Sequence, residues 1–67
     1  MSKTFEILER VGISTKSISD AVESVVVEAN EEKKISWFEV VETRGRITSE
    51  NKVEYQVSIK IGRKLND

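Results

Sequence analysis

The stretch ISWFEVVETRGRI, residues 35–47, decides how the chain is expected to fold. It contains the only tryptophan, Trp37, and one of the two phenylalanines. Successive side chains of a strand point to opposite faces, so this stretch divides into two sets. One set is Phe38, Val40 and Glu42, and the other is Ile35, Trp37, Glu39, Val41 and Thr43. A half-buried strand normally alternates apolar with polar residues, whereas both sets here carry large apolar groups. One face can pack on the chain's own helix, and the other face needs a second cover.

Two further strands and one helix are predicted around this stretch. Residues 3–11 alternate as a first strand, although neither face is clearly the apolar one. Residues 53–65 give the clearest strand pattern, with apolar side chains at the odd positions from Val53 to Ile61. The polar segment 48–52 predicts a turn, which makes an antiparallel hairpin with residues 35–47. The chain is therefore expected to have an α+β fold in the order β-α-β-β, a three-stranded antiparallel sheet with one helix packed on one face.

The helix is expected to begin at Ser14, after Gly12 interrupts the first strand. A serine hydroxyl can accept a hydrogen bond from an orphan amide of the first turn. With Ser14 as N-cap, Ile13 and Ile18 have the spacing of a hydrophobic staple. Apolar side chains then recur at three- and four-residue steps and form one stripe: Ile18, Ala21, Val22, Val25, Val26 and Ala29.

The two faces of the sheet are expected to have different partners. The helix stripe should meet Phe38, Val40 and the odd-numbered positions 53–61. Gln56, Ser58 and Lys60 should then lie on the opposite face, which also carries Trp37.

Length and composition narrow the class of protein. A single domain of 67 residues buries only about 60% of its unfolded surface and is marginal alone. The chain has no Cys, so oligomerisation remains as the way to stabilise it. A net charge of −1 argues against a nucleic-acid partner. No apolar run approaches the ~20 residues that span a bilayer. The first residues lack the apolar segment of a signal peptide, and we expect a soluble, cytoplasmic protein.

Catalysis is not expected from these residues. The chain has no His, which is the usual general base near neutral pH and the commonest metal ligand. Its two Asp and ten Glu residues mostly occupy positions where solvation explains them. The three glycines are isolated and form no phosphate-binding loop. No catalytic residue and no metal ligand is therefore assigned.

Trp37 is the most informative side chain. It could be a core or subunit-contact residue, but its place on the face away from the helix favours a cover from outside the chain. A planar heteroaromatic ring could stack on the indole, and the amide of Gln56 could bind the edge of that ring. Gln56 could equally be an ordinary exposed polar residue. Arg44 and Arg46 could bind a ligand phosphate or pair with carboxylates across the strands.

The chain as a whole resembles the dodecins. The resemblance rests on Trp37-Phe38-Glu39-Val40, Arg44-Gly45, Ile47, Glu54-Tyr55-Gln56-Val57, Gly62 and Leu65, together with Val11-Gly12, Ser14 and Ser17. Dodecins are small β-α-β-β proteins that form hollow twelve-chain shells and bind flavins in pairs between symmetry-related tryptophans. The resemblance therefore implies a homododecamer that stores or protects a flavin and is not an enzyme.

The resemblance also assigns roles to individual residues. Trp37 matches the tryptophan that stacks on the isoalloxazine ring, and Gln56 matches the glutamine that binds the polar edge of the ring. Arg44 matches an arginine of members that favour phosphorylated flavins, and Lys64 occupies a position that is often basic. FMN is thus the expected cofactor, with riboflavin or FAD as alternatives. Two positions differ from the family: Ile13 replaces a usual Thr, and Arg63 replaces a customary Phe.

A second interpretation belongs to another functional class. The chain could form a structural shell that carries a different cargo, such as a nucleotide-like cofactor or ions. Failure of the protein to take up flavin would favour this alternative.

Overall fold

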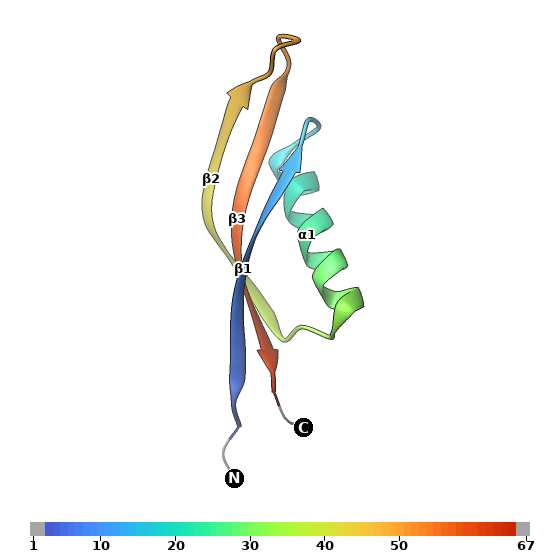
Figure 1. The fold of residues 1–67 in the computed structure, drawn as a ribbon, viewed down its shortest axis with the longest axis vertical. Coiled ribbons are helices and arrows are strands. Elements are labelled where there is room, and N and C mark those ends of the chain that lie inside the picture. The colour runs from blue at the N-terminus through green and yellow to red at the C-terminus, as the bar shows by residue number, and fades with distance from the viewer. Residues whose placement is uncertain (1–2, 66–67) are drawn as a thin grey trace.

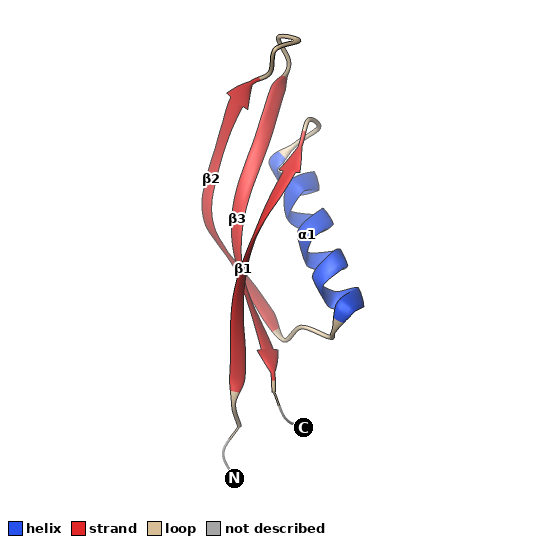
Figure 2. Cartoon of the chain, viewed as in Figure 1, coloured by secondary structure: helices blue, strands red, loops and turns tan. Residues whose placement is uncertain are grey.

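The chain folds as strand β1 (Phe5–Ser14), helix α1 (Ile18–Glu32), strand β2 (Trp37–Ile47) and strand β3 (Val53–Lys64). The computed structural model describes residues 3–65. Strand β3 lies between β1 and β2 and is antiparallel to both. The sheet is strongly twisted, and α1 lies along one of its faces (Figures 1 and 2). The α+β fold expected from the sequence, with its β-α-β-β order, is confirmed.

The molecule is long and narrow, with extents of 53 × 20 × 15 Å. The hairpin between β2 and β3 lies at one end, and the start of β1 and the end of β3 lie together at the other (Figure 1). The sheet extends beyond α1 in both directions, so the helix covers only the middle of its face (Figure 2). Much of a long sheet is therefore left uncovered by the chain's own helix.

The core lies between α1 and β3. Its fully or nearly fully buried side chains are Ala21, Val25, Ala29, Val57, Ile59 and Ile61. Phe38 and Val40 lie on the helix face, as expected, because they pair with Ile61 and Ile59. They are nevertheless 46% and 40% exposed, since α1 packs mainly over β1 and β3 rather than over β2. The single chain thus leaves apolar side chains of β2 uncovered on both faces.

The helix begins three residues later than the sequence predicted. Ser17 is the N-cap, and its hydroxyl accepts a hydrogen bond from the amide of Asp20 at 2.9 Å. Ser14 is instead the last residue of β1, where its buried hydroxyl donates to Asp20 Oδ2 at 2.7 Å. The predicted staple of Ile13 with Ile18 is also wrong, because Ile13 pairs with Gln56 on the face away from the helix. A serine at either position satisfies the capping rule, and only packing distinguishes them.

The faces of β1 are clear in the structure, although they were not clear in the sequence. Leu8, Arg10 and Gly12 face α1, and a Cβ on Gly12 would overlap Val25 and the backbone of Ala21. Phe5, Ile7, Val11 and Ile13 lie exposed on the opposite, outer face. β1 also extends further than the predicted strand 3–11 and ends at Ser14.

A β-bulge at Val41 changes the direction of the side chains in β2. Val40 pairs with Ile59 and Glu42 pairs with the next residue of β3, Ser58, which leaves Val41 without a partner. From Glu42 onward, the even-numbered residues of β2 lie on the outer face. The predicted placing of Glu42 with Phe38, and of Thr43 with Trp37, is therefore wrong. The bulge is what brings Arg44 to the face that carries Gln56.

Within the described residues 3–65, no helix combines the length and the apolar character that crossing a bilayer requires.

Candidate functional site

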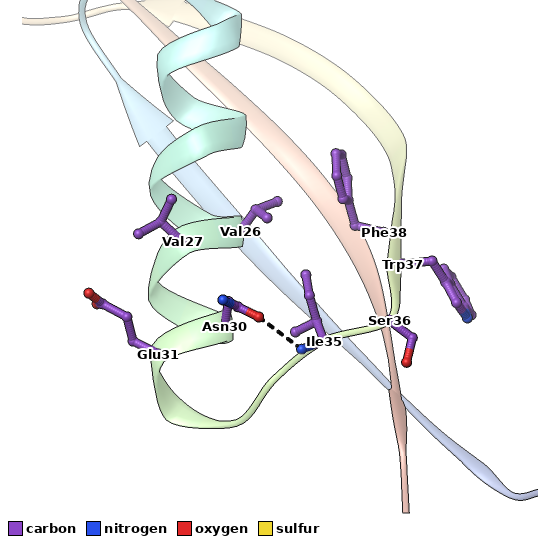
Figure 3. Close-up of a pocket in the computed structure, with 8 residues that line it drawn as sticks. All are labelled: Val26, Val27, Asn30, Glu31, Ile35, Ser36, Trp37 and Phe38. Atoms are coloured by element: carbon purple, nitrogen blue, oxygen red, sulfur yellow. Dashed lines mark hydrogen bonds between the residues drawn. The ribbon is translucent and has the colours of Figure 1, made fainter.

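Trp37 begins β2 and lies on the outer face, opposite Gly62 of β3. Its ring lies directly over Gly62, because a Cβ at that position would overlap the indole atoms Cε2, Nε1 and Cζ2. The indole remains 39% exposed and points away from α1, whereas Phe38 points toward the helix (Figure 3). The chain therefore supports one side of the aromatic ring and leaves the rest accessible to a stacking partner.

An open groove lies on the other side of β2, between the second half of α1 and the start of the strand. Its lining residues are Val26, Val27, Asn30, Glu31, Ile35, Ser36, Trp37 and Phe38. Asn30 Oδ1 accepts a hydrogen bond from the amide of Ile35 at 3.0 Å and so fixes the connection that leads into β2 (Figure 3). Trp37 lies at the edge of this groove, with its ring directed away from it.

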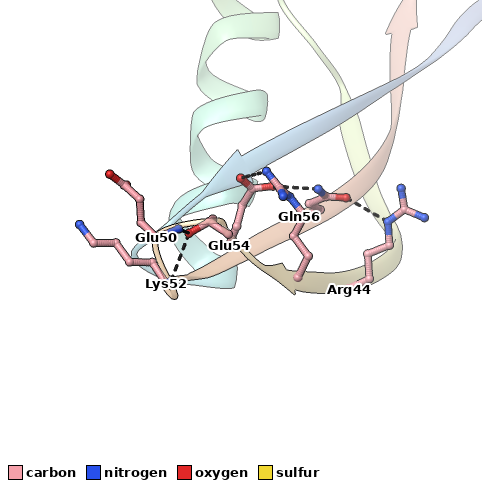
Figure 4. Close-up of polar contacts among 7 residues, drawn as sticks. Arg44, Glu50, Lys52, Glu54 and Gln56 are labelled. Carbon is pink, nitrogen blue, oxygen red and sulfur yellow. Dashed lines mark hydrogen bonds and ion pairs between the residues drawn. The ribbon is translucent and has the colours of Figure 1, made fainter.

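Gln56 and Arg44 belong to a hydrogen-bonded chain near the β2–β3 hairpin (Figure 4). Arg44 Nε donates to Gln56 Oε1 at 3.1 Å, and Gln56 Nε2 donates to Glu54 Oε2 at 2.9 Å. Arg46 Nε donates to the same Glu54 oxygen at 3.0 Å. The pairing of an arginine with a carboxylate across the strands, which is the alternative to phosphate binding, is thus made by Arg46 with Glu54.

This chain of contacts fixes the orientation of the Gln56 amide. Arg44 can only donate, so it selects the amide oxygen, and an ionised Glu54 can only accept, so it selects the amide nitrogen. The hydrogen bond from Arg46, followed by the one from Gln56, lowers the pKa of Glu54 below its ordinary value and keeps the carboxylate ionised. Gln56 retains one N–H and one oxygen lone pair, which suit a ring edge that offers one acceptor and one donor.

Trp37 and Gln56 share a face but do not meet within one chain. Trp37 pairs with Gly62, and Arg44 pairs with Gln56, so six residues of β3 separate the two positions. At about 3.3 Å per residue, the separation is about 20 Å. A three-ring heteroaromatic system cannot touch both groups of one copy. Any site that uses both residues has to take them from different copies.

Lys64 lies at the Trp37 end of the molecule. It is the last residue of β3, two positions beyond Gly62, and pairs with Phe5. It also lines a depression together with Lys33, Lys34, Ile35, Ser36 and Leu65. Of the four candidate ligand-binding residues, the structure thus places Trp37 with Lys64 and Gln56 with Arg44, at opposite ends of the sheet.

Two residues outside the predicted ligand site, Gly62 and Glu54, shape these groups. Gly62 supports the indole, and only its isolated position in a strand pattern pointed to a close approach there. Glu54 orients Gln56, although the sequence pattern assigns it no role in the site. The register across the bulge brings Glu54, Gln56, Arg44 and Arg46 together, and alternation alone does not predict that register.

The chain is similar to known proteins both in sequence and in fold. A family model described as Dodecin matches residues 4–66. A dodecin from Thermus thermophilus is 32% identical over 68 residues, which cover 100% of this chain and 99% of that protein. The structure of a dodecin from Streptomyces coelicolor is 33% identical, with a TM-score of 0.84 over 97% of this chain and 94% of that one.

A more distant relative has the same fold. A calcium dodecin from Mycobacterium tuberculosis, described as having a novel calcium-binding site, is 20% identical, with a TM-score of 0.85 over 94% of this chain and 91% of that one. At this identity the similarity concerns the fold alone. Among residues 3–65 of the present chain, no group of three or more His, Cys, Asp or Glu side chains is arranged to hold a metal ion.

Proposed function

Because the chain belongs to the dodecin family, we propose that it stores or sequesters a flavin inside a hollow homododecamer. The observation that carries this proposal is the Trp37 indole, supported on one side by Gly62 and accessible to a stacking partner on the outer face of the sheet. Stacking on an indole contributes about 1–3 kcal/mol per ring. Two flavins held between the Trp37 rings of two copies would cover the aromatic surface that one chain leaves open.

The separation within one chain supports an assembled pocket. Trp37 of one copy would stack on the isoalloxazine ring, and Gln56 of another copy would bind the polar edge of that ring. Gln56 is already oriented by Arg44 and Glu54, so little side-chain ordering remains to be done on binding. The pocket therefore exists only in the oligomer.

FMN is the flavin that we propose, with riboflavin or FAD as alternatives. Arg44 beside Gln56, and Lys64 two positions beyond the partner of Trp37 on β3, provide a cation at each end of the sheet for a ligand phosphate. We propose no catalytic residue. The protein would act in the cytoplasm as a store, and the stacked indole would quench the excited flavin by donating an electron to it.

A fluorescence titration tests this function. Adding the protein to FMN should quench flavin emission, with saturation at one flavin per chain or fewer. Trp37→Ala should weaken binding about tenfold to a hundredfold, which corresponds to the loss of about 1–3 kcal/mol of stacking. The matched control is Val41→Ala, which truncates another exposed apolar residue of β2 and should leave binding unchanged.

Two results would contradict the proposal. Flavin emission that persists at saturating protein would show that no stacked complex forms, and the alternative of a shell with another cargo would then be preferred. Unchanged FMN affinity in Trp37→Ala would show that the indole has only a structural role.

A further inference from the structure

Arg63 is an arginine on the helix-facing side of β3, where it is only 7% exposed. Its Nη2 donates to the carbonyl oxygen of Ala29, in the last turn of α1, at 2.6 Å. The same nitrogen lies 3.8 Å from Glu32 Oε1. Its buried Nε has no hydrogen-bond partner among residues 3–65. One donor of the guanidinium is therefore left unpaired where the side chain contacts the helix. Burying a charged side chain with an unpaired donor costs free energy, so we expect Arg63 to have a specific role in the structure.

The negative end of α1 explains why a cation is tolerated here. The Ala29 carbonyl lies at the C-terminal end of the helix, where the macrodipole favours positive charge. Glu32 adds a carboxylate, and Arg10 of β1 holds that carboxylate with hydrogen bonds of 2.7 and 2.6 Å. Glu28 also lies 3.6 Å from Arg10. Arg63, Glu32 and Arg10 thus join the end of α1 to two strands, and we call these three residues the helix clamp.

The helix clamp lies directly behind Trp37. Gly62 and Arg63 are consecutive residues of β3, so Gly62 faces the outer side of the sheet and the side chain of Arg63 faces the inner side. On the outer side, Gly62 supports the indole, and its carbonyl accepts a hydrogen bond from the amide of Ser36 at 2.8 Å. On the inner side, Arg63 holds the helix from which residues 33–36 run to Trp37. The start and the end of this connection are therefore both fixed to one dipeptide.

We infer that Arg63 is a positioning residue for Trp37. By fixing the C-terminal turn of α1 against β3, it determines where residues 33–36 join the sheet and so how the indole rests on Gly62. The amide of Lys33 donates to the same Ala29 carbonyl at 3.2 Å, so Arg63 adds a second, charged donor that ties this turn to β3. Without that donor, the last turn of α1 keeps its own backbone hydrogen bond but loses its attachment to the sheet. Ile35 and Ser36 would then move with this turn, and the indole would lose its single orientation.

The experiment uses Trp37 as its own reporter, since it is the only tryptophan in the chain. Emission wavelength and acrylamide quenching are measured on the ligand-free assembled protein. Arg63→Met keeps an unbranched side chain of similar length but removes every donor, and it should red-shift the emission and increase quenching. Arg63→Lys retains a cationic donor and should restore much of the original spectrum.

A matched control separates positioning from simple stability. Val57→Ala removes buried volume from the core at a position five residues from Gly62 and should lower the melting temperature without changing Trp37 emission. If Arg63→Met fails to fold, Glu32→Gln weakens the same clamp while leaving Arg63 in place and should shift the emission in the same direction by less. A folded Arg63→Met protein with the original Trp37 spectrum would overturn the inference. An equal spectral shift in Val57→Ala would overturn it as well.

The consequence for ligand affinity rests on the proposed flavin function, but the spectral test does not. Arg63→Met should lose about tenfold in FMN affinity, equivalent to about 1.4 kcal/mol. If the original protein binds no flavin and Arg63→Met still shifts the Trp37 spectrum, the flavin proposal fails and the positioning role stands. If the original protein binds FMN and Arg63→Met leaves the Trp37 spectrum unchanged, the positioning role fails and the flavin proposal stands.

Discussion

Gln56 shows how much of a binding group can be prepared by its immediate neighbours. An amide side chain can present either its oxygen or its nitrogen to a ligand, and a free one samples both. Here Arg44 and Glu54 select one orientation, and Arg46 holds Glu54 in place. Each of these partners projects from the outer face of β2 or β3, so the selection depends on register alone.

Ionisation of Glu54 is expected to make flavin binding sensitive to acid. The pKa of Glu54 in the folded protein lies below the ordinary glutamate value of 4.5. The stabilisation that its charge provides is therefore fully present above pH 4.5 and is lost as the pH falls through the lowered pKa. A protonated carboxyl can donate as well as accept, and it no longer selects the nitrogen of Gln56. FMN affinity should therefore be constant near neutral pH and fall at pH values below 4.5.

The variant Glu54→Gln tests this explanation. It should bind FMN several-fold more weakly at pH 7 and should lose the part of the acid dependence that Glu54 causes. Fluorescence titrations at a series of pH values supply the measurement, with Glu39→Gln, an exposed carboxylate of β2, as the control. The explanation is wrong if Glu54→Gln binds FMN with the original affinity at pH 7 and still loses affinity below pH 4.5 as the original protein does.

Two of the four secondary elements have ends that depend on a single polar group. Ser17 caps α1, and Ser14 closes β1 by donating to Asp20. Replacing Ser17 with alanine should lower the free energy of unfolding by about 1 kcal/mol, since it removes an N-cap acceptor. Urea unfolding measures this, and Ser19→Ala, at an exposed position in the first turn, is the matched control. Equal stabilities of the two variants would show that Ser17 is not the effective cap.

Element order and strand pairing could be predicted from the sequence, but the details that shape the site could not. The period of β3 and the apolar stripe of α1 are local signals, and both are confirmed except at Ile18 and Val53, which lie exposed. The bulge at Val41 has no such signal, because it depends on how β2 and β3 pair along their full length. Alternation without the bulge would have turned Arg44 away from Gln56. The separation of Trp37 from Gln56 likewise depends on pairing register.

At the scale of the whole molecule, residues 3–65 have more large apolar side chains exposed than buried. The exposed apolar side chains on the outer face of β1 are Phe5, Ile7, Val11 and Ile13. Both β1 and β2 are also edge strands, which expose unpaired backbone groups. A core of six buried side chains is small for an isolated domain, so contacts between copies have to contribute to stability. Family membership fits this need, because it implies self-assembly into an oligomer.

The exposed outer face of β1 predicts which valine the assembly requires. Val11 is 57% exposed on the outer sheet face, and Val27 is 56% exposed on α1, so the two are equally accessible in one chain. If copies cover the outer face, Val11→Lys buries an uncompensated charge in a contact and should break the shell into smaller species. Val27→Lys places the same charge on the helix surface and should leave the assembly intact.

Native mass spectrometry and analytical ultracentrifugation distinguish these outcomes directly. The original protein and Val27→Lys should have the mass of twelve chains, whereas Val11→Lys should dissociate, unfold at lower temperature and lose FMN binding together with its shell. Loss of FMN binding in parallel with the shell follows because Trp37 and Gln56 of one chain are about 20 Å apart along β3. A dissociated Val11→Lys protein that still binds FMN with the original affinity would mean that the pocket lies within one chain. The assembled site would then have to be abandoned.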